Sequence, residues 1–238
     1  MDPDHRNNTG RLVALIKEVD DIRSAKIVDP NFIVQAKSWM QNPTEALLGF
    51  IWTAYACMQA DKPQIDSRDL ERSITQLLEP RVRSSMSGFE PFYIQHGPFE
   101  RETMMPPPAQ PPEYDLAFVL RGNERIMWPI EAKVLKTPNA VASYVSDVTN
   151  QFLTCRYAPF SNSGAMLGYL LNGDADDAFV TIAQKLACTL DPVPGQVARK
   201  NRVSNHSRTV PAGKAYPAAF SCYHLILEYP GLTRTSVS

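Results

Sequence analysis

The first third of the chain places apolar side chains at helical spacing, every three or four positions. Helices are therefore expected over residues 12–26, 32–40, 45–60 and 68–78. Thr44 and Ser67 precede two of these segments and are expected to cap them, and Pro80 lies just beyond the expected end of the last helix. The pattern predicts a helical N-terminal lobe over residues 1–85.

Beyond this lobe, helical spacing gives way to short apolar runs separated by turns. Residues 91–99 look extended, and residues 104–112 form a proline-rich connector that cannot be regular structure. Two strands are expected over residues 114–120 and 126–135. The turn sequence Arg121-Gly122-Asn123-Glu124 joins them, so the pattern predicts a β-hairpin.

The remainder of the chain alternates between helical and strand patterns. In chain order we expect a helix over residues 143–157, a strand over 166–171, a helix over 174–186, a polar stretch over 191–217 and a strand over 222–229. The order of elements predicts an α/β protein with a core over residues 86–238, in which helices flank a mixed sheet.

The second strand of the hairpin carries two charged side chains on one face. Residues two apart on a strand share a face, so Glu131 and Lys133 project together. Ile130, Ala132 and Val134 point the other way and make an apolar face for the core. A charged pair on a half-buried strand is costly unless the protein needs both groups. The alternative is an ordinary Glu131–Lys133 surface ion pair.

The turn supplies a geometric test of this hairpin. If residues 122–124 form a three-residue loop, Asp115 lies opposite Glu131 on the same face, with Cβ atoms roughly 4.5–5.5 Å apart. Two facing carboxylates repel each other. A divalent cation resolves the conflict, because Mg²⁺ takes oxygen ligands. The hairpin therefore indicates a cation site beside Lys133.

Asp115, a gap of 15 residues and then Glu131-Ala132-Lys133 resemble the active-site motif of the PD-(D/E)xK nuclease superfamily. The proline of the motif, Pro112, is separated from the aspartate by two residues. The resemblance implies a restriction-endonuclease-like core. It also implies that Asp115, Glu131 and the backbone carbonyl of Ala132 hold Mg²⁺ or Mn²⁺, with Lys133 as the catalytic cation.

The same resemblance implies supporting residues on two neighbouring helices. A helix before the hairpin often adds an acidic residue in this superfamily, and Glu71 is the candidate here, with Asp69 second. The helix after the hairpin carries Gln151 and Tyr157, which are similar to the glutamine and tyrosine of nucleases of the RecB kind, at looser spacing. The resemblance extends from Glu71 to about Tyr169.

The overall charge does not indicate a nucleic-acid-binding protein, because the chain has 24 basic and 25 acidic residues. The polar stretch over residues 191–217 nevertheless has a local basic excess, carried by Arg199, Lys200, Arg202, Arg208 and Lys214. These residues could bind phosphates, and an ordinary solvated loop is the alternative. Arg156, next to Tyr157, is a further candidate for a phosphate contact, with a surface arginine as the alternative.

The remaining motifs limit the location and the partners. The four cysteines form no CxxC pair, residues 1–10 resemble neither a signal peptide nor a transit sequence, and no apolar run is long enough to span a bilayer. We therefore expect a cytoplasmic protein that does not associate with membranes. Since no P-loop is present, the chain is not expected to be its own ATP-driven motor. A helicase, ATPase or sensor subunit is therefore an expected partner.

The function predicted from these features is metal-dependent hydrolysis of phosphodiester bonds, with DNA as the expected substrate. The setting suggested by the resemblance is a bacterial defence or restriction system, with a homodimer among the expected partners. The alternative is a catalytically inactive nuclease-fold protein that acts as a nucleic-acid-binding or protein-interaction subunit.

Overall fold

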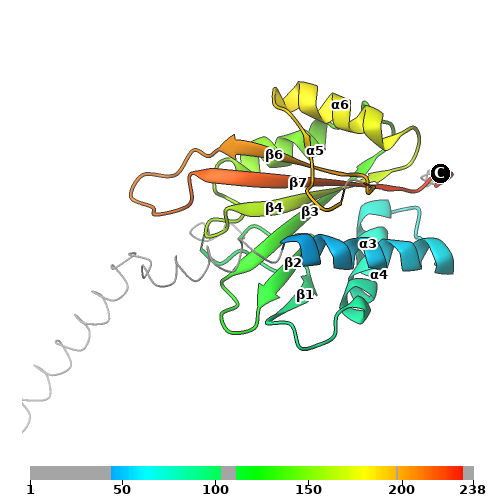
Figure 1. Ribbon diagram of the computed structural model, residues 1–238, viewed down its shortest axis with the longest axis horizontal. Helices are drawn as coiled ribbons and strands as arrows, with labels where there is room; N and C mark the ends of the chain where they lie inside the picture. The colour runs from blue at the N-terminus through cyan, green and yellow to red at the C-terminus, as the bar shows by residue number, and fades with distance from the viewer. Residues whose placement is uncertain (1–43, 103–110, 197, 233–238) are drawn as a thin grey trace, which may run out of the picture. The chain divides into compact units, whose positions relative to one another are not determined.

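The computed structural model describes residues 44–102, 111–196 and 198–232 (Figure 1). The helices expected over residues 12–26 and 32–40, and most of the proline-rich connector, lie outside these ranges. The described residues form a seven-stranded mixed sheet flanked by helices, which confirms the α/β class.

The sheet has a parallel centre between two antiparallel arms. In spatial order its strands are β1 (Phe92–His96), β2 (Leu116–Leu120), β3 (Met127–Leu135), β4 (Ser163–Leu170), β7 (Ala219–Glu228), β6 (Asn201–Ser207) and β5 (Asp191–Pro192). β4 pairs in parallel with both β3 and β7, and every other pairing is antiparallel. β4 therefore joins the arm β1–β2–β3 to the arm β7–β6–β5.

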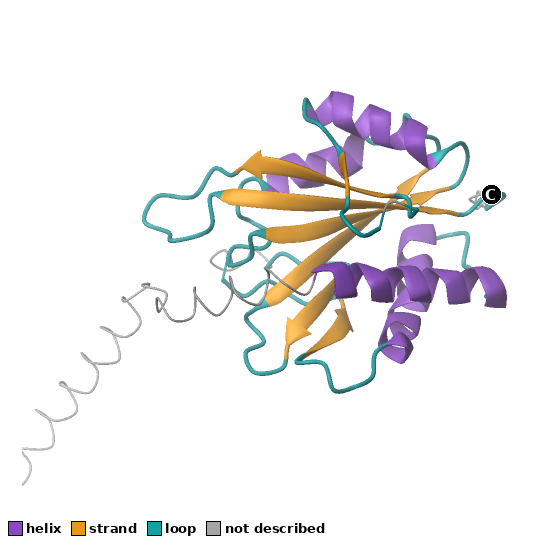
Figure 2. Cartoon of the chain, in the orientation of Figure 1, coloured by secondary structure: helices purple, strands orange, loops and turns teal. Residues whose placement is uncertain are grey.

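Helices cover both faces of the sheet (Figure 2). α3 (Thr44–Asp61) and α4 (Leu70–Ser85) pack together on one face, where the Phe50 ring lies 6.4 Å from that of Phe118. α5 (Ala142–Asp147), the π-helix η1 (Val148–Phe152) and α6 (Ala175–Leu186) bury their apolar side chains on the other face. All of these helices belong to the same compact unit as the sheet.

The register of the β2–β3 hairpin agrees with the one predicted from its turn. Leu116 pairs with Ile130, and Val119 pairs with Met127. This register aligns the residue before Leu116, which is Asp115, with Glu131. Local signals set this hairpin: a polar turn flanked by two apolar runs.

Helix α4 differs from its prediction at both ends. Its N-cap is Asp69, whose side chain accepts a hydrogen bond from the Arg72 backbone N–H, and not Ser67. At the other end the helix continues through Pro80 to Ser85. Val82, beyond the proline, is fully buried and continues the apolar stripe of the helix. Tertiary packing has therefore outweighed the proline's preference against a helix interior.

Two other predicted segments differ from the structure, one in the length of its α-helix and one in its secondary structure. The helix expected over residues 143–157 is α-helical only to Asp147 and then widens into η1. The polar stretch over residues 191–217 contains two strands, β5 and β6. β6 carries mostly polar side chains, so its sequence has no apolar alternation to indicate a strand. Its hydrogen bonds to β7 define it instead.

In the part of the chain that the structure describes, no helix is both long and apolar enough to cross a membrane.

Candidate active site

The site begins where β2 ends and β3 continues. Pairing between the two strands stops at Leu116 and Ile130, so the next residues of β3 have no β2 partner. Two carboxylates take over the hydrogen bonds of the missing strand. Asp115 Oδ2 accepts from the Ala132 N–H at 2.7 Å, and Glu71 Oε2 accepts from the Val134 N–H at 3.2 Å. The divergence of the strands therefore fixes one carboxylate from the hairpin and one from α4 beside β3.

The Lys133 ammonium lies at the centre of these groups. Its Nζ is 2.7 Å from the Ala132 carbonyl oxygen, and carboxylates surround it on other sides. Their oxygens lie at 2.8 Å (Glu131), 3.2 Å (Asp147), 3.4 Å (Glu71) and 4.0 Å (Asp115). The predicted convergence of Asp115, Glu131, Lys133 and Glu71 is thus present. Four carboxylates around one ammonium leave three negative charges uncompensated when all are ionised.

Burial and like charges shift the pKa values of the cluster. Burial raises the pKa of Glu131 well above its usual range, Asp115 raises it further, and Lys133 opposes both effects. Burial also raises the pKa of Glu71. Burial alone would lower the pKa of Lys133, but Glu131, Glu71 and Asp115 outweigh it and raise that pKa. Lys133 therefore stays a charged ammonium group and is unsuited to act as a general base at neutral pH.

Three buried side-chain oxygens near this centre or on the adjoining helix accept no hydrogen bond. They are Glu131 Oε2, Asp147 Oδ2 and Gln151 Oε1. The Glu131 side chain is only 9% exposed, so water cannot readily satisfy its second oxygen. An unpartnered carboxylate oxygen at this depth needs an explanation, and a hard cation such as Mg²⁺ is the natural partner for oxygen donors.

The donor atoms fit a divalent cation in kind, although they are not arranged as a finished metal site. Among the described residues, no three His, Cys, Asp or Glu side chains are grouped so that they could hold a metal ion as they stand. Lys133 lies between the carboxylates instead. A cation could reach Asp115, Glu131 and the Ala132 carbonyl only if the lysine moved away from them.

Asp147 is a member of the cluster that the sequence analysis missed. It is the last residue of α5, which packs against β3. Its signal in the sequence was its position four residues before Gln151, one helical turn away on the same side. A search for the motif alone could not find it, because the pattern contains no aspartate at that position.

Of the two supporting residues predicted for the helix after the hairpin, Tyr157 lies near the cluster carboxylates, beyond the end of η1. Tyr157 is buried, and its hydroxyl donates to the Glu113 carbonyl oxygen at 3.2 Å. Burial raises the pKa of Tyr157, and the nearby Glu131 and Asp147 raise it further. Gln151 follows Asp147 by four residues, within the π-helix. Both residues lie on the segment that covers this face of the sheet.

Arg208 does not lie on an exposed phosphate-binding surface. It is 7% exposed, and its guanidinium donates to four backbone carbonyl groups. The acceptors are Phe152, Tyr157, Ala158 and Ser161, at 2.6–3.0 Å. The prediction that Arg208 contacts nucleic acid is therefore wrong, because its donors are already used inside the protein.

The other basic residues of the polar stretch have partners away from the cluster. Lys200 and Arg202 both pair with Asp176 of α6, at 2.6 and 3.2 Å. The Arg199 guanidinium lies 5.9 Å from the centroid of the Trp52 ring. Within the described residues, no hydrogen bond or ion pair joins these three to the carboxylates. Arg156 is exposed in the turn after η1.

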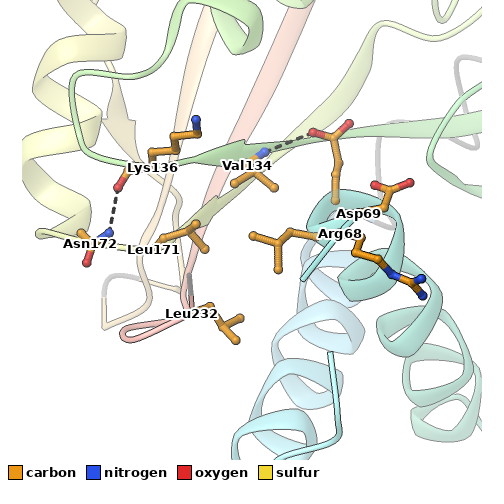
Figure 3. Close-up of a pocket in the computed structure, with 9 residues that line it drawn as sticks. Arg68, Asp69, Val134, Lys136, Leu171, Asn172 and Leu232 are labelled. Carbon is orange, nitrogen blue, oxygen red and sulfur yellow. Dashed lines mark hydrogen bonds between the residues drawn. The ribbon is translucent and has the colours of Figure 1, made fainter. Parts of the chain in front are cut away.

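Open hollows flank Glu71 on two sides. One, of about 730 Å³, lies between α4, the end of β3 and the segment after β4. Figure 3 shows Lys136, Asn172 and Leu171 on one of its sides and Arg68 and Asp69 on the other. A second hollow, of about 530 Å³, includes Asp115 in its lining. Asp69 and Glu71 line both hollows, so Glu71 is accessible from either side and Asp115 from one.

Comparisons of the chain with protein-family models, with curated proteins and with solved structures find no match. The chemistry of the cluster must therefore be inferred from its geometry.

Proposed function

We propose that this protein is a metal-dependent nuclease that hydrolyses phosphodiester bonds, with DNA as the expected substrate. One observation carries the proposal: four carboxylates from three parts of the chain converge on Lys133, while a buried oxygen of Glu131 has no partner. Such a cluster is destabilising unless it has a ligand to bind. The proposal includes a restriction-endonuclease-like core with a helical N-terminal lobe.

In this proposal Asp115, Glu131 and the Ala132 carbonyl oxygen would hold Mg²⁺ or Mn²⁺. When bound, such an ion supplies Lewis-acid polarisation of the phosphate and a more acidic water. Lys133 would stabilise the negative charge that develops on the phosphate, since its raised pKa keeps it cationic. Glu71 would hold the edge of β3 that has no β2 partner through the Val134 N–H and so keep these groups aligned.

Gln151 and Tyr157 would complete the wall of the site on the helix side. The hollows beside Glu71 give a nucleic-acid strand access to Asp115 and Glu71. Arg156 is retained as a proposed phosphate contact because it is exposed next to Tyr157. Arg199, Lys200 and Arg202 could contact nucleic acid only at a distance from the cluster.

Cleavage assays test the proposal directly. Purified protein is incubated with supercoiled, linear and single-stranded DNA and with RNA, each with Mg²⁺, Mn²⁺ or EDTA. Glu131→Ala and Lys133→Ala should remove cleavage. Asp177→Asn and Lys185→Ala, at exposed positions of α6, should keep it. Cleavage that persists in EDTA, or that survives both cluster substitutions, would contradict the proposal.

A second candidate is a catalytically inactive protein of the same fold that binds nucleic acid or another protein. It is favoured by the position of Lys133 between the carboxylates and by the lack of a ready-made metal group in the described part of the chain. Calorimetric titration with Mn²⁺ separates the two candidates, because only the nuclease requires the cation to bind. For either candidate we propose a helicase, ATPase or sensor subunit as a partner. We also propose a homodimer and a cytoplasmic location.

A further inference from the structure

Lys133 uses two oxygen atoms that the proposed cation would also need. Its Nζ lies 2.7 Å from the Ala132 carbonyl oxygen and 2.8 Å from Glu131 Oε1. An ammonium group and a divalent cation repel each other strongly at such separations. They cannot share these oxygens, so Lys133 must take another partner when a cation binds.

Asp147 is the carboxylate best placed to receive Lys133. Its Oδ2 is already 3.2 Å from the ammonium nitrogen and accepts no hydrogen bond. The other remaining carboxylate, Glu71, already accepts a hydrogen bond from Lys133 at 3.4 Å through Oε1 and one from the Val134 N–H through Oε2, so both of its oxygens are in use. Asp147 therefore offers a free acceptor on the side of the site covered by α5.

The fold holds this carboxylate in place. Tyr144, in the same short helix, lies with its hydroxyl 3.0 Å from His224 Nδ1, which anchors α5 to β7. Immediately after Asp147 the helix widens into η1, and both Val148 and Phe152 are fully buried there. Widened turns of this kind recur at functional sites. Asp147 is thus presented to β3 by an anchored helix.

We propose that Asp147 is a positioning residue for Lys133, which moves onto Asp147 when a divalent cation occupies the oxygens of Asp115, Glu131 and Ala132. This inference rests on the proposed function. Lys133 then keeps a fixed orientation beside the substrate phosphate and no longer competes with the cation for Glu131.

The first test compares Asp147→Asn with the full-length wild type. The substitution should lower kcat about 100-fold, leave KM unchanged and change the Mn²⁺ affinity by less than about tenfold. Asp147→Glu should recover part of the loss. Asp177→Asn makes the same charge change at an exposed position of α6 and should behave as the wild type. An unchanged kcat overturns the proposal. A larger loss of Mn²⁺ affinity also does so, because Asp147 would then be a ligand of the ion.

A second test does not depend on cleavage. The ¹⁵N NMR signal of the Lys133 ammonium group, assigned with Lys133→Arg, should shift when Mg²⁺ is added and remain protected from solvent exchange. In Asp147→Asn, Mg²⁺ should instead broaden it. If wild-type protein binds Mg²⁺ without moving this signal, the proposal is overturned.

The two proposals fail in different ways. A wild type that binds no divalent cation overturns both of them. A wild type that binds Mg²⁺ and transfers Lys133 to Asp147, yet cuts no nucleic acid, overturns the proposed nuclease and leaves the role of Asp147 standing.

Discussion

At the residue scale, Glu131 carries a conflict between stability and chemistry. It is nearly buried, one of its oxygens has no hydrogen bond, and Asp115 lies close to it. Lys133 offsets part of the cost of ionising it. Strain of this kind is typical of sites that are selected for binding or catalysis, because stability alone would remove it.

We therefore expect Glu131→Gln to raise the melting temperature in EDTA while removing cleavage. The pKa of Glu131 is raised in the folded protein, so its favourable contribution is present at low pH and is lost as pH rises. The amide removes that loss. The difference in melting temperature between the variant and the wild type should grow with pH. Each kcal/mol of stabilisation should raise the melting temperature by about 2–4 °C. Calorimetric melting curves at several pH values measure it, and a lower melting temperature for the variant at pH 8 would contradict the argument.

At the scale of elements, one side chain from another part of the chain makes four hydrogen bonds to the segment that runs from the end of η1 to β4. Arg208, just after β6, donates to the carbonyl groups of four residues of this segment. Two residues there, Cys155 and Ala158, have positive φ angles of 61° and 52°. Such backbone is unfavourable for residues with side chains unless its surroundings fix it, and the Arg208 guanidinium provides that fixation.

Arg208→Ala should lower the free energy of unfolding by about 3 kcal/mol or more, because it leaves several buried carbonyl groups without a donor. Arg208→Lys should recover little, since an ammonium group cannot reproduce the planar fork of donors. Arg202→Ala, which breaks a pair with the exposed Asp176, should cost less than about 1 kcal/mol. Urea unfolding of the three variants gives these values, and equal losses for Arg208→Ala and Arg202→Ala would show that the four hydrogen bonds contribute little.

The elements that could be predicted from the sequence are those set by local signals. The hairpin register followed from the turn at residues 122–124, and it brought Asp115 and Glu131 together as expected. β6 and the role of Arg208 depend on partners distant in sequence, and neither leaves a periodic pattern. Asp147 entered the site because α5 packs against β3, and its spacing of four residues from Gln151 gives its helix face without indicating that contact.

At the scale of the whole molecule, a buried histidine joins three elements. His224 of β7 is fully buried, with Nδ1 3.0 Å from the Tyr144 hydroxyl of α5 and Nε2 2.8 Å from Ser204 Oγ of β6. Burial lowers the pKa of His224 to about 3, and the nearby His206 adds to this effect. The neutral imidazole is therefore part of the folded structure.

This histidine should make the protein sensitive to acid. An unfolded histidine binds a proton near pH 6.5 and the folded one only near pH 3, so stability is present above 6.5 and is lost as pH falls between these values. The loss should be roughly 1 kcal/mol per pH unit. Urea unfolding at pH 7, 6, 5 and 4 should give a shallower pH dependence for His224→Gln than for the wild type. An NMR titration showing the His224 ring protonated at pH 6 would refute the explanation.

The two arms of the sheet separate the residues of the cluster from part of the outer surface. This separation affects how the sequence of such a protein can change in evolution. Every member of the cluster, from Glu71 to Asp147, precedes β4 in the chain, and the arm β7–β6–β5 supplies none of them. The second arm could therefore be exchanged for a different β-structure, provided that the replacement pairs with β4 where β7 pairs now, holds the segment that Arg208 holds and anchors α5 as His224 does. Recombination at the α6–β5 junction would then give chains that share one chemistry and present different outer surfaces to their partners.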